Sequence, residues 1–225
     1  MAAPSFIQEA ETSWASTNST TITTGSFSVL AGDILVAFSI LSNWVDTDHN
    51  LTITGGSLTW TEQQTIRISS YCSLTLATAV VDSNKSMTVT STRTGASALG
   101  FGLNVLTFRS SDGVGASSKT NVSSGAPTLN LTTTQANSAI VVANGDWNAI
   151  DGASRTWRTN AGALTEQTYA LTATQATNYG GYHADAGAIA TYAVGLSAPG
   201  AQKYSIAAVE VKGAASDTLY AQSIM

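Results

Sequence analysis

The feature that most constrains this chain is an internal repeat with a spacing of about 104 residues. An apolar run at 33–38 leads into a loop that contains Trp44, and a similar run at 138–143 leads into a loop around Trp147. Further pairs keep nearly the same spacing: 61–63 with 165–167, 87–89 with 192–194, and 104–108 with 208–212. Several weak matches at one spacing indicate a duplicated unit. Two copies, at about 21–111 and 128–214, predict either one sandwich made of two similar halves or two small sandwiches.

Both copies have the composition of β-strands. Short runs rich in Val, Ile, Thr, Tyr and Phe are bounded by Gly, Asn, Asp and Ser, and helical periodicity is absent. This pattern predicts an all-β, jelly-roll-like β-sandwich over 1–215. Strands are expected at 21–29, 33–41, 51–54, 61–69, 73–81, 87–92 and 100–109, and at 128–133, 139–144, 156–158, 167–173, 179–184, 189–196 and 204–212.

Two segments are expected to lie outside the strands. The Ser- and Gly-rich stretch 110–118 is the most linker-like part of the chain and is expected to connect the copies. The C-terminal tail, 216–225, ends in apolar residues. It is interpreted either as a frayed end or as a peptide that docks on a neighbouring subunit.

Charge and composition exclude several classes of protein. Charged residues make up only 10% of the chain and the net charge is −5, with the basic residues scattered, so no nucleic-acid partner is expected. No apolar run is long enough to insert into a membrane, and the N-terminus lacks the pattern of a signal peptide. Cys72 is the single cysteine, so no internal disulfide can form, and a buried, inert thiol is expected.

Ser and Thr make up about a quarter of the chain and take the place of charged residues. A surface of neutral hydroxyl groups gives little electrostatic repulsion between copies. Such a surface suits a protein packed against neighbours, and equally a robust extracellular β-protein. An extracellular character without an export signal is typical of a protein that is made in a cytosol and released by lysis, as virion proteins are.

No catalytic or cofactor motif is present. His49 and His183 lie one in each copy, and neither belongs to a metal-binding pattern. The spacing selects no catalytic pair among the carboxylates, and the equivalent places of Glu62 and Glu166 in the repeat favour structural roles for both. We therefore expect no enzyme activity, no metal and no cofactor. The candidate carboxylates are Asp46, Asp48, Glu62, Asp146, Asp151, Glu166 and Asp185.

Two loops allow alternative interpretations. Asp46, Asp48 and Asn50 match the opening of a calcium loop, but the glycine and the bidentate glutamate of that motif are missing, so a hydrogen-bonded turn is the default. The matching loop of the second copy offers Asp146, Asn148 and Asp151. Trp44 and Trp147 could stack on sugar rings, although such side chains more often cover the open end of a core.

Several stretches together resemble a known group of proteins. GDILVA at 32–37, LTWT at 58–61 and NVLTFRSSDGV at 104–114 resemble strands of jelly-roll-like repeats in phage and bacterial surface proteins. With TQANSAIVV at 134–142, the chain is similar to accessory virion proteins of tailed actinobacteriophages, often labelled minor tail proteins. The resemblance implies a noncatalytic structural or adhesive role and carries over no site residues.

The function expected from the sequence is that of a structural accessory protein of a tailed bacteriophage particle, located in the virion on the tail or capsid surface. The expected partners are other virion proteins and further copies of the chain as a homo-oligomer. The alternative is a glycan-binding module that contacts a host-surface glycan through the loops of Trp44 and Trp147.

Overall fold

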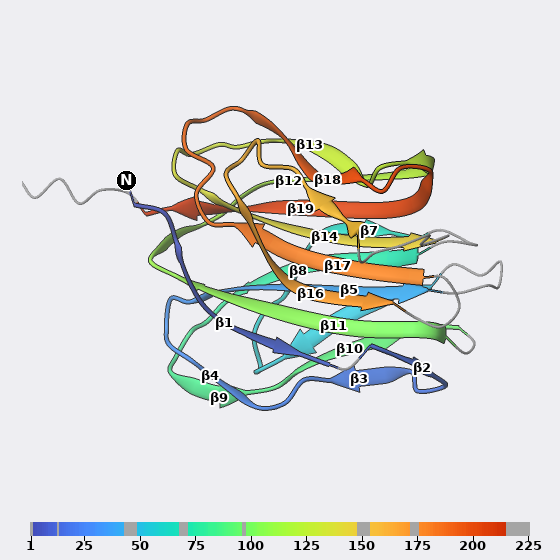
Figure 1. Ribbon diagram of the computed structural model, residues 1–225. Helices are drawn as coiled ribbons and strands as arrows, with labels where there is room; N and C mark the ends of the chain where they lie inside the picture. The colour runs from blue at the N-terminus through green and yellow to red at the C-terminus, as the bar shows by residue number, and fades with distance from the viewer. Residues whose placement is uncertain are drawn as a thin grey trace, which may run out of the picture.

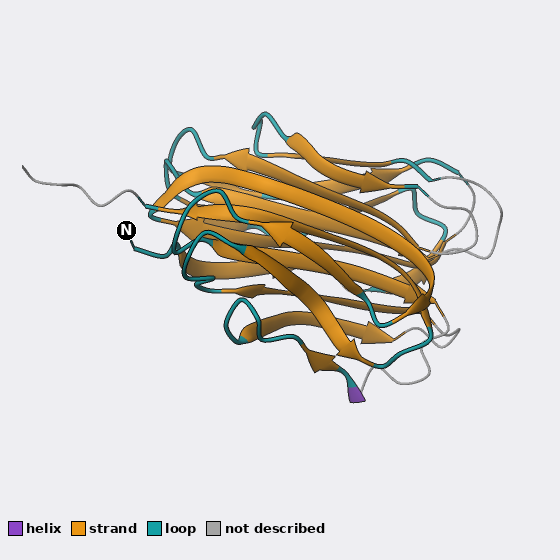
Figure 2. Cartoon of the chain, turned by 90° about the horizontal axis from the view of Figure 1, so that it is seen from above, coloured by secondary structure: helices purple, strands orange, loops and turns teal. Residues whose placement is uncertain are grey.

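The computed structural model describes residues 2–12, 14–42, 49–67, 72–95, 98–147, 154–171 and 176–214. Strands make up 70% of the chain and helix 1%, which confirms the predicted all-β class. The strands run along one long axis of the molecule, and the loops gather at its two ends (Figure 2).

The first half of the chain forms two sheets and a short strand pair. The larger sheet has the order β1-β11-β5-β8-β7, with β2 also paired to β11; the smaller has the order β3-β10-β6; and β4 pairs with β9. Their bounds are β1 Ser5–Glu11, β2 Ala15–Thr17, β3 Thr21–Thr23, β4 Phe27–Val29, β5 Ile34–Ser42, β6 Leu51–Gly55, β7 Thr61–Ile66, β8 Cys72–Val80, β9 Lys85–Met87, β10 Val89–Arg93 and β11 Ala98–Arg109.

The second half repeats this arrangement. Its larger sheet has the order β12-β19-β14-β17-β16 and its smaller sheet the order β13-β18-β15. In each half the chain passes repeatedly between the two sheets, as in a jelly roll. The bounds are β12 Ser111–Gly125, β13 Thr128–Thr132, β14 Ala139–Trp147, β15 Thr156–Trp157, β16 Leu164–Leu171, β17 Ala176–His183, β18 Thr191–Ala198 and β19 Gln202–Gly213.

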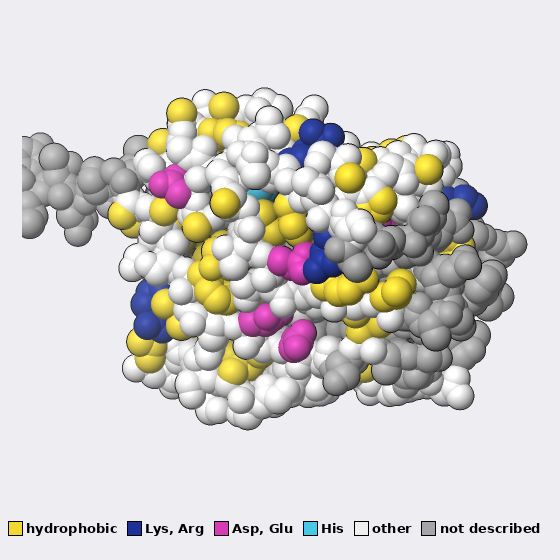
Figure 3. All heavy atoms as spheres, viewed as in Figure 1, with side chains coloured by type: hydrophobic (Ala, Val, Ile, Leu, Met, Phe, Trp, Pro, Cys, Tyr) yellow, Lys and Arg dark blue, Asp and Glu magenta, His cyan; other side chains and the backbone are white. Residues whose placement is uncertain are grey.

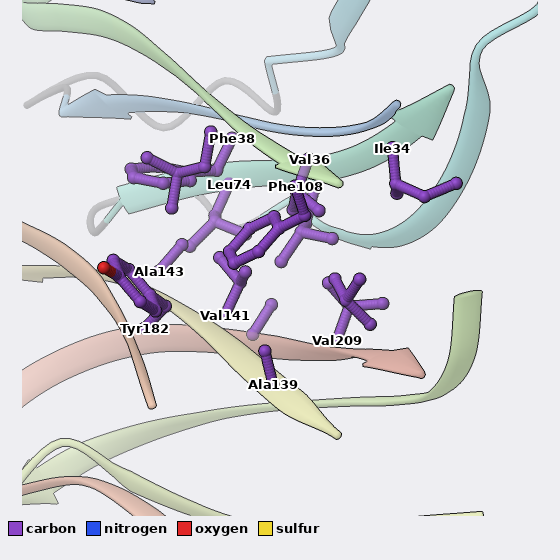
Figure 4. Close-up of a cluster of buried hydrophobic side chains, with 14 of the residues drawn as sticks. Ile34, Val36, Phe38, Leu74, Phe108, Ala139, Val141, Ala143, Tyr182 and Val209 are labelled. Atoms are coloured by element: carbon purple, nitrogen blue, oxygen red, sulfur yellow. The ribbon is translucent and has the colours of Figure 1, made fainter. Parts of the chain in front are cut away.

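The four sheets form four layers, with the small sheets on the outside, near the top and the bottom of Figure 1, and the two large sheets between them. The two large sheets pack against each other, and the core between them includes Phe38 and Phe108 from the first half and Val141 and Val209 from the second (Figure 4). Each small sheet covers the other face of its large sheet. Two sandwiches therefore share one central core. Because β5 and β14 are covered on both faces, every residue in them is buried.

The registers support most of the sequence matches. Glu62 pairs with Ala77 and Glu166 pairs with Gly181, and each strand has a bulge directly after the glutamate. The closing strand differs by one residue: in register, 104–108 corresponds to 207–211 and not to 208–212. A shift of one residue turns every side chain to the other face. Here both faces are apolar, so alternation in the sequence could not show the error.

Two expectations about the chain order were wrong. The segment 110–118 is not a linker, because most of it belongs to β12, the long edge strand of the second large sheet. Its Ser and Gly residues are held there by pairing with β19, with three irregularities in register. The strand β1 precedes the predicted first copy and occupies the place equivalent to that of β12. The tail 216–225 lies outside the described residues.

Candidate functional site

The histidines and the cysteine occupy structural positions. Nδ1 of His49 lies 2.5 Å from the carbonyl oxygen of Thr94, and Nδ1 of His183 lies 2.9 Å from that of Gly162; both rings are buried. Burial raises the pKa of the Cys72 thiol to about 12. Among the described residues, no group of three or more His, Cys, Asp or Glu side chains is placed to hold a metal ion.

The candidate carboxylates separate into three groups. Asp46, Asp48 and Asp151 lie outside the described residues, as do Asn148 and Trp44, so the calcium interpretation of the first loop stays a prediction. Glu62 and Asp185 are exposed on the surface. Asp146 is buried in the second sandwich, and Glu166 is half-buried at its surface.

Glu166 and its neighbours form an ionic and aromatic cluster. Arg155 donates two hydrogen bonds to the Glu166 carboxylate, and Nε1 of Trp157 donates a third at 2.7 Å. Although burial opposes it, these bonds lower the pKa of Glu166. The Arg155 guanidinium also lies 3.8 Å from the centroid of the Tyr169 ring. This supports a structural role for Glu166, whereas Glu62 has no equivalent environment.

The cluster continues to Asp146 at the end of β14. The ring of Tyr169 stacks on that of Tyr179 with centroids 6.0 Å apart, and the Tyr179 hydroxyl donates to Oδ2 of Asp146. Asp146 is 0% exposed, and Oδ1 has no hydrogen-bond partner. Burial raises its pKa to about 7, although the bond from Tyr179 acts in the opposite direction. The equivalent register position in the first half is Leu41, so only the second sandwich has a carboxyl group here.

Trp147 does not present a sugar-stacking face. Its side chain is only 7% exposed, because it ends the fully buried strand β14. The structure therefore contradicts the use of Trp147 as an exposed platform. The more common role, covering the end of a core, fits its burial.

A cavity of about 170 Å³, which we call the junction pocket, opens between the two large sheets. Its floor is formed by Asn104 of β11 and Asn178 of β17, which are 7% and 4% exposed. Nδ2 of Asn104 donates to Glu9 at 2.6 Å and to Glu11 at 3.2 Å. The remaining lining residues are Glu11, Thr12, Trp14, Gly102, Thr168, Tyr169 and Ala170.

Acidic side chains lie near the junction pocket, as does the Arg155 guanidinium on the ring of Tyr169. Asp and Glu side chains gather on the face where β1, β11 and β16 lie (Figure 3). Burial, with a smaller contribution from the charge of Glu11, raises the pKa of Glu9 to about 7 against the bond from Asn104. Sequence reasoning missed this site because β1 lies before the predicted first copy. Glu9 and Glu11, two residues apart and so on one face of a strand, were the available signal.

In comparisons with known proteins, no family model, curated protein or solved structure matches the chain. Within its described part, the chain contains no helix with the length and apolar character needed to cross a bilayer.

Proposed function

We propose that this chain is a noncatalytic structural accessory protein of a tailed bacteriophage particle, displayed on the tail or the capsid surface. The observation that supports this most is the four-layer stack, in which the central strands β5 and β14 are buried along their whole length. A duplicated framework of this kind devotes its repeated positions to a rigid core. An exposed catalytic cleft would instead require polar groups that converge at equivalent places.

The low charge of the chain is compatible with close packing against other proteins. Only 10% of the residues are charged, and some of them are paired with each other, as in Lys85–Asp82, Arg109–Asp33 and Arg155–Glu166. Low charge density leaves little repulsion against other virion proteins or further copies of the chain. The proposed location is therefore the virion.

The decisive experiment counts this chain in purified particles. Quantitative mass spectrometry of gradient-purified phage should find it at a fixed ratio to the major capsid protein. A high copy number would indicate decoration of the shell, and a few copies would indicate the tail tip. A chain that stays in the soluble lysate and is missing from the particles would refute the proposal.

The C-terminal tail has its own test. Removal of 216–225 should prevent incorporation into particles while the purified domain keeps its thermal unfolding temperature. Normal incorporation of the truncated chain would refute a docking role for this segment.

A second candidate function is glycan binding at the host envelope. The junction pocket favours it, because two buried amides, one carboxylate and an indole line one cavity there. Trp147 does not support this candidate, because it is buried. Trp44 lies outside the described residues.

A further inference from the structure

The duplication provides an internal control for the junction pocket. Since both large sheets have the same strand order, the place where β1 and β16 line the junction pocket has its counterpart in the contact between β12 and β7. In that counterpart, which we call the closed seam, Nε2 of Gln64 donates to Oγ of Ser117 at 2.8 Å. Nζ of Lys119 donates to the carbonyl oxygen of Thr65 at 2.6 Å. Polar groups of the two halves therefore bond directly across the closed seam, beside a surface hollow of about 340 Å³ that is lined by 65–67 and 119–121.

At the junction pocket, the register places acidic residues at the same positions. Glu9 is equivalent to Ser117 and Glu11 to Lys119, because each pair faces matching residues of β11 and β19. Both glutamates accept hydrogen bonds from Asn104, which belongs to their own half. The Glu11 carboxylate thus belongs to the lining of the junction pocket, whereas Lys119 at the equivalent position bonds directly to the other half.

The two residues at the floor of the junction pocket differ from their equivalents in the other seam, and packing alone does not explain the difference. The equivalents of Asn104 and Asn178 are Ala207 and Leu74, and both of these belong to the central hydrophobic core. Leucine and alanine therefore suffice to join the sheets at this point. Oδ1 of Asn178 is buried without a hydrogen-bond partner, which costs stability. An amide oxygen that is left unpaired at this cost indicates a ligand that donates a hydrogen bond to it.

The wall of the pocket adds an aromatic surface and a donor. Trp14 lies flat on β11, where a Cβ on Gly102 would come within 2.2 Å of its ring. Glycine at this position is therefore needed for the indole to lie where it does. Nε1 of Trp14 is buried and also has no partner. The lining of the pocket thus includes an indole, the buried and unpaired oxygen of Asn178 and the carboxylate of Glu11.

We propose that the junction pocket binds one sugar ring of a neutral saccharide. Neighbouring hydroxyl groups of a sugar can donate hydrogen bonds to both the Asn178 oxygen and the Glu11 carboxylate. A sugar ring can lie against the Trp14 indole, and the Glu11 carboxylate repels phosphate. The volume of about 170 Å³ lies well below the roughly 300 Å³ of a drug-sized site, which fits a single ring. This inference deepens the second candidate function and does not depend on a place in a virion.

The test uses the purified full chain and a panel of glucose, galactose, mannose, rhamnose, arabinose and N-acetylglucosamine. Titrations followed by NMR should show saturable binding of at least one sugar, with a Kd on the order of 1 mM and a shift of the Trp14 indole N–H signal. Asn178→Leu, which copies Leu74 of the closed seam, should abolish binding and leave the protein folded. Glu11→Gln, at an exposed position, should weaken binding by a factor of about 10.

The matched control is Ser117→Ala, which alters the closed seam and should leave sugar binding unchanged. If Asn178→Leu does not fold, Glu11→Gln still decides the question. The proposal is overturned if none of the sugars binds, or if Glu11→Gln binds as tightly as the original chain. Binding of Ca²⁺ or spermidine at the pocket, with no sugar bound, would also overturn it. These results leave the particle experiment unaffected, so each proposal can fail separately.

Discussion

The buried carboxyl group of Asp146 should make this protein less stable as the pH rises. Burial raises its pKa from 3.8 to about 7 in the folded state. Because the native state binds the proton more tightly than the unfolded chain does, stability falls as the pH rises from about 4 through about 7. The slope is about 1.4 kcal/mol per pH unit while only the unfolded chain is ionised. The slope falls as the native carboxyl also begins to ionise near pH of about 7, so between pH of about 5 and about 7 the loss is roughly 2 kcal/mol.

The substitution Asp146→Asn isolates this effect. An asparagine keeps the shape and can still accept from the Tyr179 hydroxyl, but it does not titrate. At pH of about 5 the variant and the original chain should have similar stability. At pH of about 8 the variant should be more stable by roughly 2–3 kcal/mol, which is a rise in Tm of roughly 5–10 °C for a chain of this size.

Thermal and urea unfolding at several pH values between about 5 and about 8 would measure the difference. The exposed Asp112 provides a matched control, and Asp112→Asn should follow the original chain at every pH. A stability difference between Asp146→Asn and the original chain that stays constant over this range would refute the reasoning. It would mean that the Asp146 carboxyl is already ionised, or exchanges with solvent, in the native state.

Three further predictions concern the interior. Glu210 is 0% exposed and accepts hydrogen bonds from the backbone N–H groups of Ala116, Thr134 and Gln135, so Glu210→Gln should lower the free energy of unfolding by about 3 kcal/mol in urea titrations. Gly180→Ala would place a Cβ 2.3 Å from the Phe38 ring and should cost about 1–3 kcal/mol, measured in the same way. The Cys72 thiol, with a pKa of about 12, should resist iodoacetamide at pH of about 8 until the protein unfolds, as mass spectrometry of the intact chain would show; rapid labelling of the native protein would contradict its burial.

Particular elements show how far the sequence could be interpreted. Local composition and a common spacing were enough to predict the apolar runs of β5 and β14. The same signals identified the equivalent glutamates near the start of β7 and β16. The strand β12 was missed because its Ser and Gly residues have little intrinsic strand character, and only pairing with β19 makes them a strand. The junction pocket could not be predicted, since its floor brings together Asn104 and Asn178 from different halves of the chain.

The sequence by itself determined that this protein is all-β and duplicated, because strand composition and repetition are local properties of the chain. Only the tertiary structure decided that the two sandwiches stack through their large sheets. Strands that are apolar on both faces do not reveal which face meets which partner. Nor does the repeat reveal where its two copies differ in function. The registers show that Asp146 is equivalent to Leu41 and that Asn178 is equivalent to Leu74. In both pairs the residue of the first half is buried and apolar, so the polar residue of the second half becomes distinctive only in the structure.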